Sequence, residues 1–248
     1  MASKSDAKFA DIQREVAAYC SEHGDPVLVA KYSRYFREGY DAYGLSEEKV
    51  HTLRDNISSK YNLNCKEIIR LGEQLLQPGK YEYGTVAILL LMKQTAAYDA
   101  DTLQGVKSWF DSGVNNWAHS DILCSRVTPV FLEKGIAPLE SFASWRKAES
   151  RWTRRAVPVT MLCLRKTANP QELLSFLNPM MDDAERVVHQ GLGWFLRELW
   201  KLHPQPVEDF LLQHKNHCAR LIIQYATEKM TSEHKLRFRK DKIKKGLI

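Results

Sequence analysis

The sequence predicts an all-α protein, and two observations carry this prediction. Apolar residues recur every three or four positions in nearly every segment, whereas almost nothing alternates at every second position as a half-buried strand would. Proline lies at or near several of the expected helix starts, where its missing N–H removes no hydrogen bond. From these patterns we predict helices at about 6–22, 26–42, 46–60, 64–77, 81–98, 101–111, 115–134, 138–147, 150–166, 170–178, 182–203, 205–214 and 216–230.

Local signals support the boundaries of the helices in the first half of the chain. Asp25-Pro26 is typical of a helix start, and so is Ser46 when it is followed by Glu47, Glu48 and Lys49. Gln77-Pro78-Gly79 and Lys134-Gly135 are typical of helix ends, because glycine takes the conformation that follows a last helical turn.

The second half has signals of the same kind and one exception. Ala137-Pro138, Asn169-Pro170 and Gln205-Pro206 predict helix starts. Gly191 and Gly193 lie inside the expected helix over 182–203, where each glycine costs about 1 kcal/mol relative to alanine. Such a pair predicts the close approach of another backbone or of a ligand.

The lengths of these helices and of their connections predict how they pack. Successive helices group into antiparallel pairs of roughly 35–45 residues, which is the period of HEAT-like repeats. A stack of such pairs curves and has a long groove on its concave face. We therefore expect a curved α-solenoid of HEAT-like antiparallel helix pairs with a concave basic groove, as one domain over residues 1–232 that is followed by a basic C-terminal tail, residues 233–248.

Composition excludes several classes of protein. A hydrophobic content of 44% and a charged content of 27% are ordinary for a globular protein and argue against disorder. The strongest apolar run, Ala87 to Met92, is too short to span a bilayer, and the N-terminus lacks the apolar stretch of a signal peptide. We expect a cytoplasmic protein whose five scattered cysteines are reduced thiols. His214, His217 and Cys218 lack a second ligand pair, so no metal is expected.

Charge is divided unevenly along the chain. Residues 1–124 contain 14 lysines and arginines against 17 acidic residues, whereas residues 125–248 contain 22 against 13. This asymmetry predicts a polyanionic partner for the second half, with nucleic acid ahead of a membrane surface. The tail, residues 233–248, carries seven lysines and arginines and is either a solvated end or a contact to phosphates.

The stretch from Asn116 to Asp121 is the first candidate for chemistry. On a helix, Trp117 and Asp121 are four residues apart and share one face. The negative face of the indole ring and the charge of the carboxylate together suit a cationic ligand or transition state. The alternative is a core tryptophan beside a solvated or helix-capping acid.

Three further clusters combine aromatic, basic or glycine residues. Lys31 to Arg37 places Tyr32 and Tyr35 among cations, which suits stacking on sugars or bases beside phosphate contacts, although a packed amphipathic helix has the same pattern. Arg151, Arg154 and Arg155 repel one another, so we expect at least one of them to contact a phosphate or a buried carboxylate.

The third of these clusters runs from Gly191 to Trp200. Trp194 directly follows Gly193, and Arg197 beside Glu198 is expected to form a structural ion pair between helices rather than to take part in catalysis. The sequence contains no phosphate-binding glycine loop, no nucleophile elbow, no HExxH and no CxxC, so the chemistries that depend on these motifs lack their signatures.

In this order, four segments resemble the AlkD-like family of HEAT-repeat DNA glycosylases, bacterial enzymes of alkylation repair. The segments are Lys31-Tyr32 with the following Arg34-Tyr35-Phe36, Asn116 to Asp121, Trp152 to Ala156, and Gly193 to Glu198. The resemblance covers about residues 25–230. It implies that Trp117, Asp121, Arg155 and Trp194 match the active-site residues of the family, and that Tyr32, or Tyr35 in its place, matches the N-terminal tyrosine.

The resemblance also implies an activity: hydrolysis of the N-glycosidic bond of cationic N3- and N7-alkylated purines in duplex DNA, without base flipping. Asp121 would stabilise an oxocarbenium ion on the deoxyribose, and Trp117 and Trp194 would pack around the sugar. No cofactor is expected, and no lysine lies in the motifs that contain Trp117, Asp121, Arg155 and Trp194 to form a Schiff base. The residues expected to contact DNA are Arg155, Tyr32, Arg154, Arg151, Tyr35, His119 and Arg197.

The expected partner is double-stranded DNA with alkylated bases, bound by a monomer that associates with the bacterial nucleoid and with no membrane. Two other functions stay open at this point. One is a non-catalytic HEAT-repeat module that binds damaged or branched DNA, and the other is a helical scaffold that binds proteins.

Overall fold

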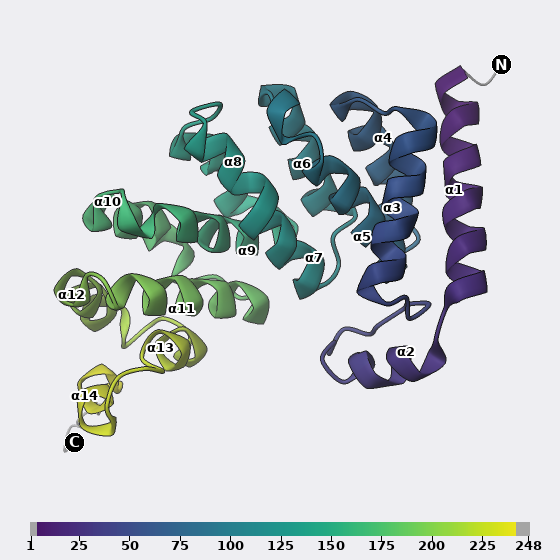
Figure 1. Cartoon of the computed structure of the whole chain (residues 1–248). Coiled ribbons are helices and arrows are strands. Elements are labelled where there is room, and N and C mark those ends of the chain that lie inside the picture. The colour runs from purple at the N-terminus through teal and green to yellow at the C-terminus, as the bar shows by residue number, and fades with distance from the viewer. Residues whose placement is uncertain (1–3, 242–248) are drawn as a thin grey trace. The chain divides into compact units, whose positions relative to one another are not determined.

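A computed structural model of the chain describes residues 4–241, which form helices and connecting turns with no strand in that range (Figure 1). The all-α prediction is confirmed. Contacts divide the chain into two compact units, Met1–Ser141 and Phe142–Ile248, and each is described by itself. The single array over 1–232 and its concave basic groove stay predictions. Between residues 4 and 241, no helix combines the length and the apolar character needed to cross a membrane.

Unit 1 is a stack of helices in chain order. Its helices are α1 (Lys4–His23), α2 (Pro26–Ser33), α3 (Glu47–Tyr61), α4 (Cys65–Leu76), α5 (Tyr81–Met92), α6 (Ala100–Ser112), α7 (Trp117–Ile122) and α8 (Thr128–Glu133). A 3₁₀ turn, Thr95–Ala97, follows α5, and a π-helical turn, Leu123–Val127, joins α7 to α8. Helix α5 packs against α3, α4 and α7, so it supports the start of α7 from within the unit.

Helix caps in unit 1 follow the predicted signals. The side chain of Ser46 accepts a hydrogen bond from the backbone N–H of Lys49, as predicted for the start of α3. Asp25 caps α2 in the same way through the N–H of Val27. Gly79, after the end of α4, has a φ of 75°, the left-handed conformation that glycine adopts most easily.

The prediction of one helix over 26–42 is wrong, because α2 ends at Ser33. Turns follow, and an extended segment then leads to α3. Gly39 and Gly44 have φ values of 102° and 84°, which a right-handed helix cannot contain. At Gly44 no other residue fits, since a Cβ atom there would lie 2.1 Å from the carbonyl oxygen of Asp25.

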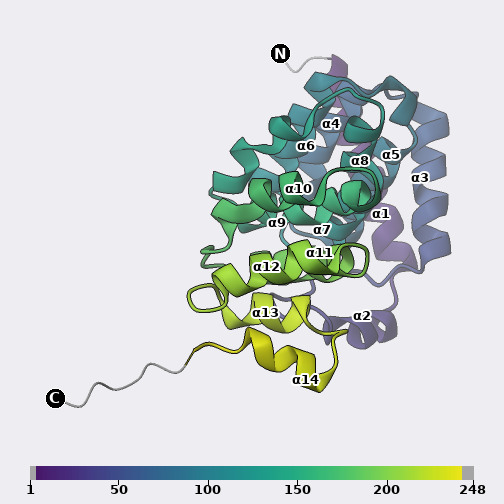
Figure 2. The ribbon, with the colours of Figure 1, turned by 90° about the vertical axis from the view of Figure 1, so that its left-hand side faces the viewer.

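Unit 2 is organised around its longest helix. Its helices are α9 (Arg151–Thr160), α10 (Pro170–Leu177), α11 (Arg186–Trp200), α12 (Pro204–His214), α13 (Arg220–Ala226) and α14 (Ser232–Lys235). Short 3₁₀ segments lie at Ser144–Lys147, Met161–Lys166, Asn178–Met180 and Leu236–Phe238. Helix α11 packs against α9, α12 and α13, and α12 and α13 run beside it in Figure 2. Leu192, Phe195, Leu196 and Leu199 of α11 are fully buried in these contacts.

Two predicted α-helices are wholly or partly 3₁₀. The segment predicted as a helix over 138–147 forms two 3₁₀ stretches, Leu139–Phe142 and Ser144–Lys147. Phe142 and Trp145 are its buried residues, and their spacing of three fits a 3₁₀ turn as well as an α-helix. The helix predicted over 150–166 becomes 3₁₀ after Thr160, two residues beyond Pro158, whose ring removes a hydrogen bond from α9.

The first part of the predicted basic tail forms short helical turns that pack on unit 2. Phe238 is fully buried, and its carbonyl oxygen accepts a hydrogen bond of 2.9 Å from Arg220 on α13. Asp241 pairs with Lys215 at 2.6 Å and accepts a hydrogen bond from Asn216 at 2.9 Å. Residues 233–241 therefore pack on unit 2, and the remainder of the predicted tail, residues 242–248, lies outside the described residues.

Candidate active site

The predicted Trp117 and Asp121 pair lies on α7 in unit 1. Asn116 caps this helix, and its side-chain oxygen accepts the backbone N–H of His119 at 2.9 Å. Because residues 117–122 are helical, Trp117 and Asp121 are on the same side of α7, as the spacing predicts. Trp117 is 40% exposed and Asp121 is half-buried, so the interpretation of Trp117 as an ordinary core residue is wrong.

The indole of Trp117 is held by the segment that follows α2. Its Nε1–H donates a hydrogen bond of 3.0 Å to the carbonyl oxygen of Tyr35. The ring of Phe36 stacks on it with centroids 5.3 Å apart and planes inclined by 26°. One ring face and the only polar atom of this side chain are therefore engaged within the protein. What Trp117 offers to a ligand is the π surface that remains, which attracts cations.

His119 is buried, so the prediction that it contacts DNA is wrong. Its Nε2 lies 3.0 Å from the carbonyl oxygen of Tyr81 and 3.1 Å from Oγ1 of Thr85. Its Nδ1 lies 3.0 Å from Nδ2 of Asn116. A carbonyl oxygen only accepts and an amide NH₂ only donates, so the neutral ring carries its proton on Nε2. Both nitrogens of His119 thus bind inside the unit and tie α7 to α5.

The neutral state of His119 has a consequence for stability. Burial lowers its pKa from 6.5 to about 4, against the opposing effect of the hydrogen bond to Tyr81. As the pH falls, His119 is protonated in the unfolded chain before it is protonated in the folded one. The contribution of neutral His119 to the free energy of unfolding is therefore complete above about pH 6.5 and is lost between about pH 6.5 and 4. At pH 4.5 we expect a loss of about 2–3 kcal/mol from this residue.

The measurement is the free energy of unfolding in urea at pH 7.5 and at pH 4.5, for the native chain and for a His119→Gln variant. The fall in free energy between the two pH values is expected to be larger in the native chain. An equal fall in both proteins would contradict the assignment of a neutral, buried His119.

The cation and aromatic cluster predicted at Lys31 to Arg37 lies near Trp117. Tyr32 and Tyr35 are 38% and 53% exposed. The ammonium of Lys31 lies 5.3 Å from the ring centroid of Tyr32, and the guanidinium of Arg34 lies 4.9 Å from that of Tyr35. Exposed rings beside cations are suited to nucleic acid, so both tyrosines remain candidates for contact with DNA. Tyr35 is the one that is linked to Trp117.

The arginines predicted at 151–155 have three different environments in unit 2. Arg154 donates to both carboxylate oxygens of Asp183, at 2.6 and 3.4 Å, and its Nη1 binds two backbone carbonyls. The expected contact of one arginine with a buried carboxylate is thus confirmed, and all three guanidinium nitrogens of Arg154 are engaged. Arg155 is buried, with Nη1 2.8 Å from the carbonyl oxygen of Val187. Arg151 is the most exposed, 3.7 Å from Glu185.

The cluster on α11 contains the close approach that its glycines predict. A Cβ atom on Gly193 would lie 2.4 Å from Cβ of Tyr225 on α13, whereas one on Gly191 would have no contact shorter than 3.3 Å. Trp194 follows and is half-buried. Arg197 pairs with Glu198 at 2.9 Å, as predicted, but both residues belong to α11, so this pair does not join two helices. Arg197 also pairs with Glu228 in the turn that follows α13.

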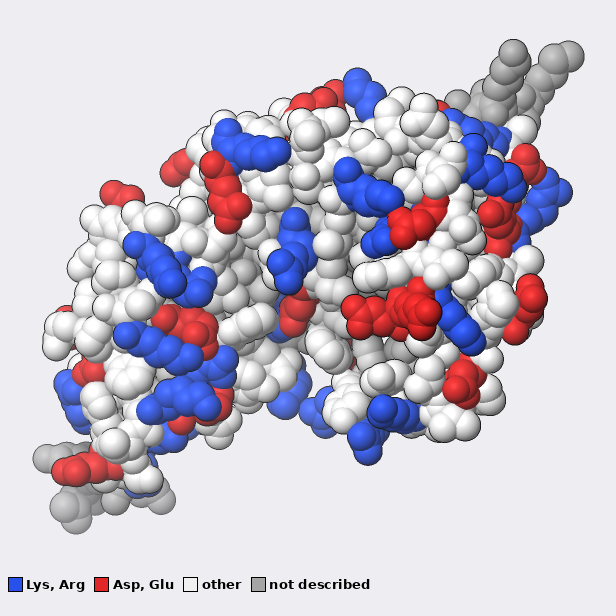
Figure 3. Space-filling view, in the orientation of Figure 1, with Lys and Arg blue, Asp and Glu red and all other residues white. Residues whose placement is uncertain are grey.

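The four predicted active-site residues are divided between the units. Trp117 and Asp121 belong to unit 1, and Arg155 and Trp194 belong to unit 2. A site that contains all four therefore stays a prediction. On the face shown in Figure 3, acidic side chains lie among the basic ones in both units.

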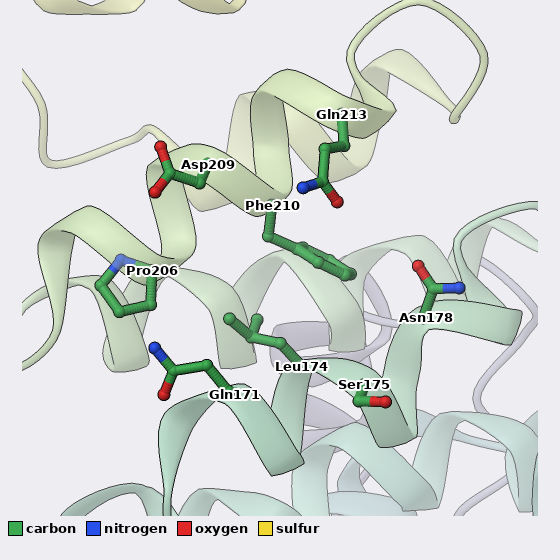
Figure 4. A pocket seen from close by; sticks show the side chains of 8 residues that line it. All are labelled: Gln171, Leu174, Ser175, Asn178, Pro206, Asp209, Phe210 and Gln213. Atoms are coloured by element: carbon green, nitrogen blue, oxygen red, sulfur yellow. The ribbon is translucent and has the colours of Figure 1, made fainter.

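Unit 2 has a separate cavity of about 370 Å³ between α10 and α12 (Figure 4). It is lined by Gln171, Leu174, Ser175, Asn178, Pro206, Asp209, Phe210 and Gln213. Phe210 and Leu174 point into the space between the two helices, with amide side chains around them. None of the predicted site residues lines this cavity. Asn178 already binds Nε2 of His214 at 2.8 Å, and within residues 4–241 no three His, Cys, Asp or Glu side chains group as metal ligands.

Residues 18–230 match the sequence pattern of a family described as DNA alkylation repair enzyme. The chain belongs to this DNA alkylation repair enzyme family. Membership assigns the protein to DNA repair and implies that it binds DNA. Comparison with curated proteins gives no match.

Two solved structures support the fold of this DNA alkylation repair family member. A predicted DNA alkylation repair enzyme from Enterococcus faecalis is 19% identical, with a TM-score of 0.71 over 85% of this chain and 98% of that one. The smu.31 protein of Streptococcus mutans UA159 is 18% identical, with a TM-score of 0.55 over 74% of this chain and 98% of that one. At these identities the likeness concerns the fold alone.

Sequence patterns do not predict the roles of two residues, one that contacts Trp117 and one that binds the segment supporting it. Phe36 stacks on Trp117, and Glu82 of α5 binds the segment between α2 and α3. Glu82 lies among apolar positions of α5, which is a signal for a buried, hydrogen-bonded acid. Nothing in the sequence indicates its partners, which are 37 to 39 residues away.

Proposed function

We propose that the protein is a monofunctional DNA glycosylase that removes cationic N3- and N7-alkylpurines from duplex DNA, without flipping the base. The observation that carries the proposal is the pair on α7: a half-buried carboxylate one helical turn from a fixed and exposed indole. A carboxylate and a π surface on one side of a helix both favour positive charge. The DNA alkylation repair family supplies the context, because alkylated purines carry that charge.

The chemistry needs no group beyond the protein, the DNA and water. The alkylated purine leaves with the electrons of its C1′–N9 bond and is thereby neutralised, and positive charge develops on the deoxyribose. The carboxylate of Asp121 stabilises this oxocarbenium ion and positions a water molecule. The water oxygen bonds to C1′ and its proton goes to solvent, so that the products are the free base and an abasic site.

Trp117 contributes through its ring. Since its N–H binds Tyr35 and Phe36 covers one face, the ring cannot turn to make a polar contact without breaking both interactions. A fixed π surface binds a cationic sugar more strongly than a neutral one, by roughly 0.5–2 kcal/mol. Such a difference favours the transition state over the bound substrate. In unit 2, Trp194 is proposed to pack against the sugar and backbone in the same way.

Contacts to phosphate are assigned to the basic residues that keep exposed surface. In unit 1 these are Lys31 and Arg34 beside Tyr32 and Tyr35. In unit 2 Arg151 keeps such surface, whereas Arg154 and Arg197 are withdrawn because their guanidinium groups bind carboxylates. Arg155 is buried, and its proposed contact with phosphate rests on the family resemblance alone. Contacts of this type make affinity depend on salt and give little sequence preference.

The test is release of 7-methylguanine and 3-methyladenine from methylated duplex DNA by the purified protein. We expect both bases to appear in solution, each leaving an abasic site, with no strand cleavage. Salt-dependent binding to branched or damaged DNA without any base release would contradict the proposal and select the non-catalytic module. Absence of DNA binding would select the protein-binding scaffold.

A further inference from the structure

Trp117 is positioned by a segment that has no secondary structure of its own. Residues 34–46, the connecting segment, join α2 to α3 through turns and extended backbone. Tyr35 and Phe36 in this segment make the hydrogen bond and the ring stack that hold Trp117. The ring of Tyr40 stacks on Phe36, with centroids 4.4 Å apart. The orientation of the indole therefore depends on what holds residues 34–46.

One buried carboxylate holds the end of this segment. Glu82 of α5 is 1% exposed. Its Oε2 accepts the backbone N–H of Tyr43 at 2.9 Å, and its Oε1 accepts those of Gly44 and Leu45 at 2.7 and 3.2 Å. Three successive N–H groups thus converge on one carboxylate. This arrangement gives an extended stretch of chain the hydrogen bonds that a helix or sheet would otherwise supply.

The same end of α5 makes further contacts with the connecting segment. The N–H of Tyr81 donates to the carbonyl oxygen of Asp41 at 2.8 Å, and Lys80 forms an ion pair with the Asp41 carboxylate. The ring of Tyr81 contacts Phe36 and Tyr40 on one side, at 5.7 and 5.1 Å between centroids. It also stacks on His119 of α7 at 4.9 Å. The start of α5 therefore joins the segment that holds Trp117 to the helix that carries Trp117.

We infer that Glu82 is a positioning residue for the glycosylase reaction: it fixes the connecting segment so that Phe36 and Tyr35 hold the indole of Trp117 with its π surface toward the DNA. This inference rests on the proposed function for its catalytic part only. Glu82 touches neither substrate nor water at the reaction centre. It binds three backbone N–H groups of the connecting segment, and this segment in turn holds Trp117 through the carbonyl of Tyr35 and the ring of Phe36.

A Glu82→Gln variant tests this role with the smallest change of shape. The amide has one oxygen where the carboxylate has two, so its NH₂ group faces a backbone N–H and no longer accepts from it. The connecting segment is expected to loosen. Under single-turnover conditions with a duplex that contains one 7-methylguanine, we expect the rate of base release to fall roughly 10- to 100-fold. Affinity for undamaged duplex is expected to change little.

The matched control is Glu208→Gln in unit 2. Glu208 is also a buried glutamate; its carboxylate accepts hydrogen bonds from Trp200 at 3.0 Å and Arg237 at 2.5 Å, and it lies 3.1 Å from Nε2 of His234. The substitution is chemically the same and also removes a buried charge. The partners of Glu208 all belong to unit 2, so the rate of base release is expected to stay near that of the native chain.

A spectroscopic readout makes the test independent of activity. In protein labelled with 5-fluorotryptophan, ¹⁹F NMR resolves the six tryptophans, and a Trp117→Phe variant assigns Trp117. We expect Glu82→Gln to shift or broaden the Trp117 resonance, and Glu208→Gln to change that of Trp200 instead. An unchanged Trp117 resonance in Glu82→Gln would overturn the inference. Absence of base release by the native chain would overturn the proposed function alone.

Hydrogen exchange of the native chain keeps the inference testable if Glu82→Gln does not fold. When the connecting segment opens, the N–H of Gly44 and the indole N–H of Trp117 lose their partners together. Their opening free energies, after correction for intrinsic rates, are therefore expected to agree. An indole N–H that opens far more readily than Gly44 would show that Trp117 is held independently of Glu82.

Discussion

Replacement of Asp121 by asparagine is expected to lower the rate of base release from methylated duplex DNA by about 100- to 1,000-fold, as removal of one electrostatic stabiliser of a transition state does. Asparagine keeps the shape of the side chain and removes its charge. The ground-state complex forms mainly through phosphate contacts, so affinity for the duplex is expected to remain close to that of the native chain. The two quantities are measured by single-turnover release of 7-methylguanine and by DNA binding at fixed salt.

An exposed aspartate of the same unit provides the control. Asp101 on α6 is paired with Lys66 at 3.5 Å on the surface, where ion pairs contribute little. Asp101→Asn makes the same change of charge and is expected to leave the rate unchanged. An Asp121→Asn variant that releases base at the native rate would contradict the assigned role. Loss of DNA binding in parallel with the rate would show instead that Asp121 supports the fold or the complex.

Periodicity predicts the helices well where the apolar spacing and the capping signals agree. At Ser46 the cap, the acidic first turn and the buried face of α3 all indicate the same start, and the structure has it. Between residues 34 and 46 the apolar spacing continues although the helix does not. There Glu82 binds the backbone N–H groups of residues 43–45, and Gly39 and Gly44 adopt positive φ values that a helix cannot contain. Contacts between distant residues override the local pattern.

In the candidate site, too, local spacing predicts which side chains share a helix face but not which distant residues they contact. Spacing on a helix is enough to place Trp117 and Asp121 on one side of α7. The burial of His119 depends instead on α5, because only a glycine at position 84 leaves room for its ring: a Cβ atom there would lie 2.5 Å from Cε1 of His119. Repulsion among the arginines at 151–155 correctly indicates an anion. It does not distinguish Asp183, 29 residues away, from a phosphate.

Gly193→Ala is expected to destabilise the protein by about 2–3 kcal/mol, which is typical of an added methyl group in a tightly packed contact. The new Cβ atom would lie 2.4 Å from Cβ of Tyr225 and 2.9 Å from the backbone oxygen of Ile222. One atom is a backbone oxygen of α13 and the other is a Cβ atom fixed to its backbone, so no side-chain rotation relieves the clash. Helices α11 and α13 must separate, and Leu192, Phe195 and Leu196 lose part of their packing as a result.

Gly191→Ala is the matched control, because it makes the same substitution two residues earlier in the same helix. Its Cβ atom would lie 3.3 Å from Cγ of Pro158 and 3.4 Å from Cγ of Arg155, close contacts with side-chain atoms that small shifts relieve. Alanine also favours the helix by about 1 kcal/mol, so the free energy of unfolding is expected to change by less than about 1 kcal/mol. Urea unfolding of both variants compares them directly. If the two variants are equally stable, the contact between α11 and α13 is looser than the structure indicates, and Trp194, which follows Gly193, is not fixed by it.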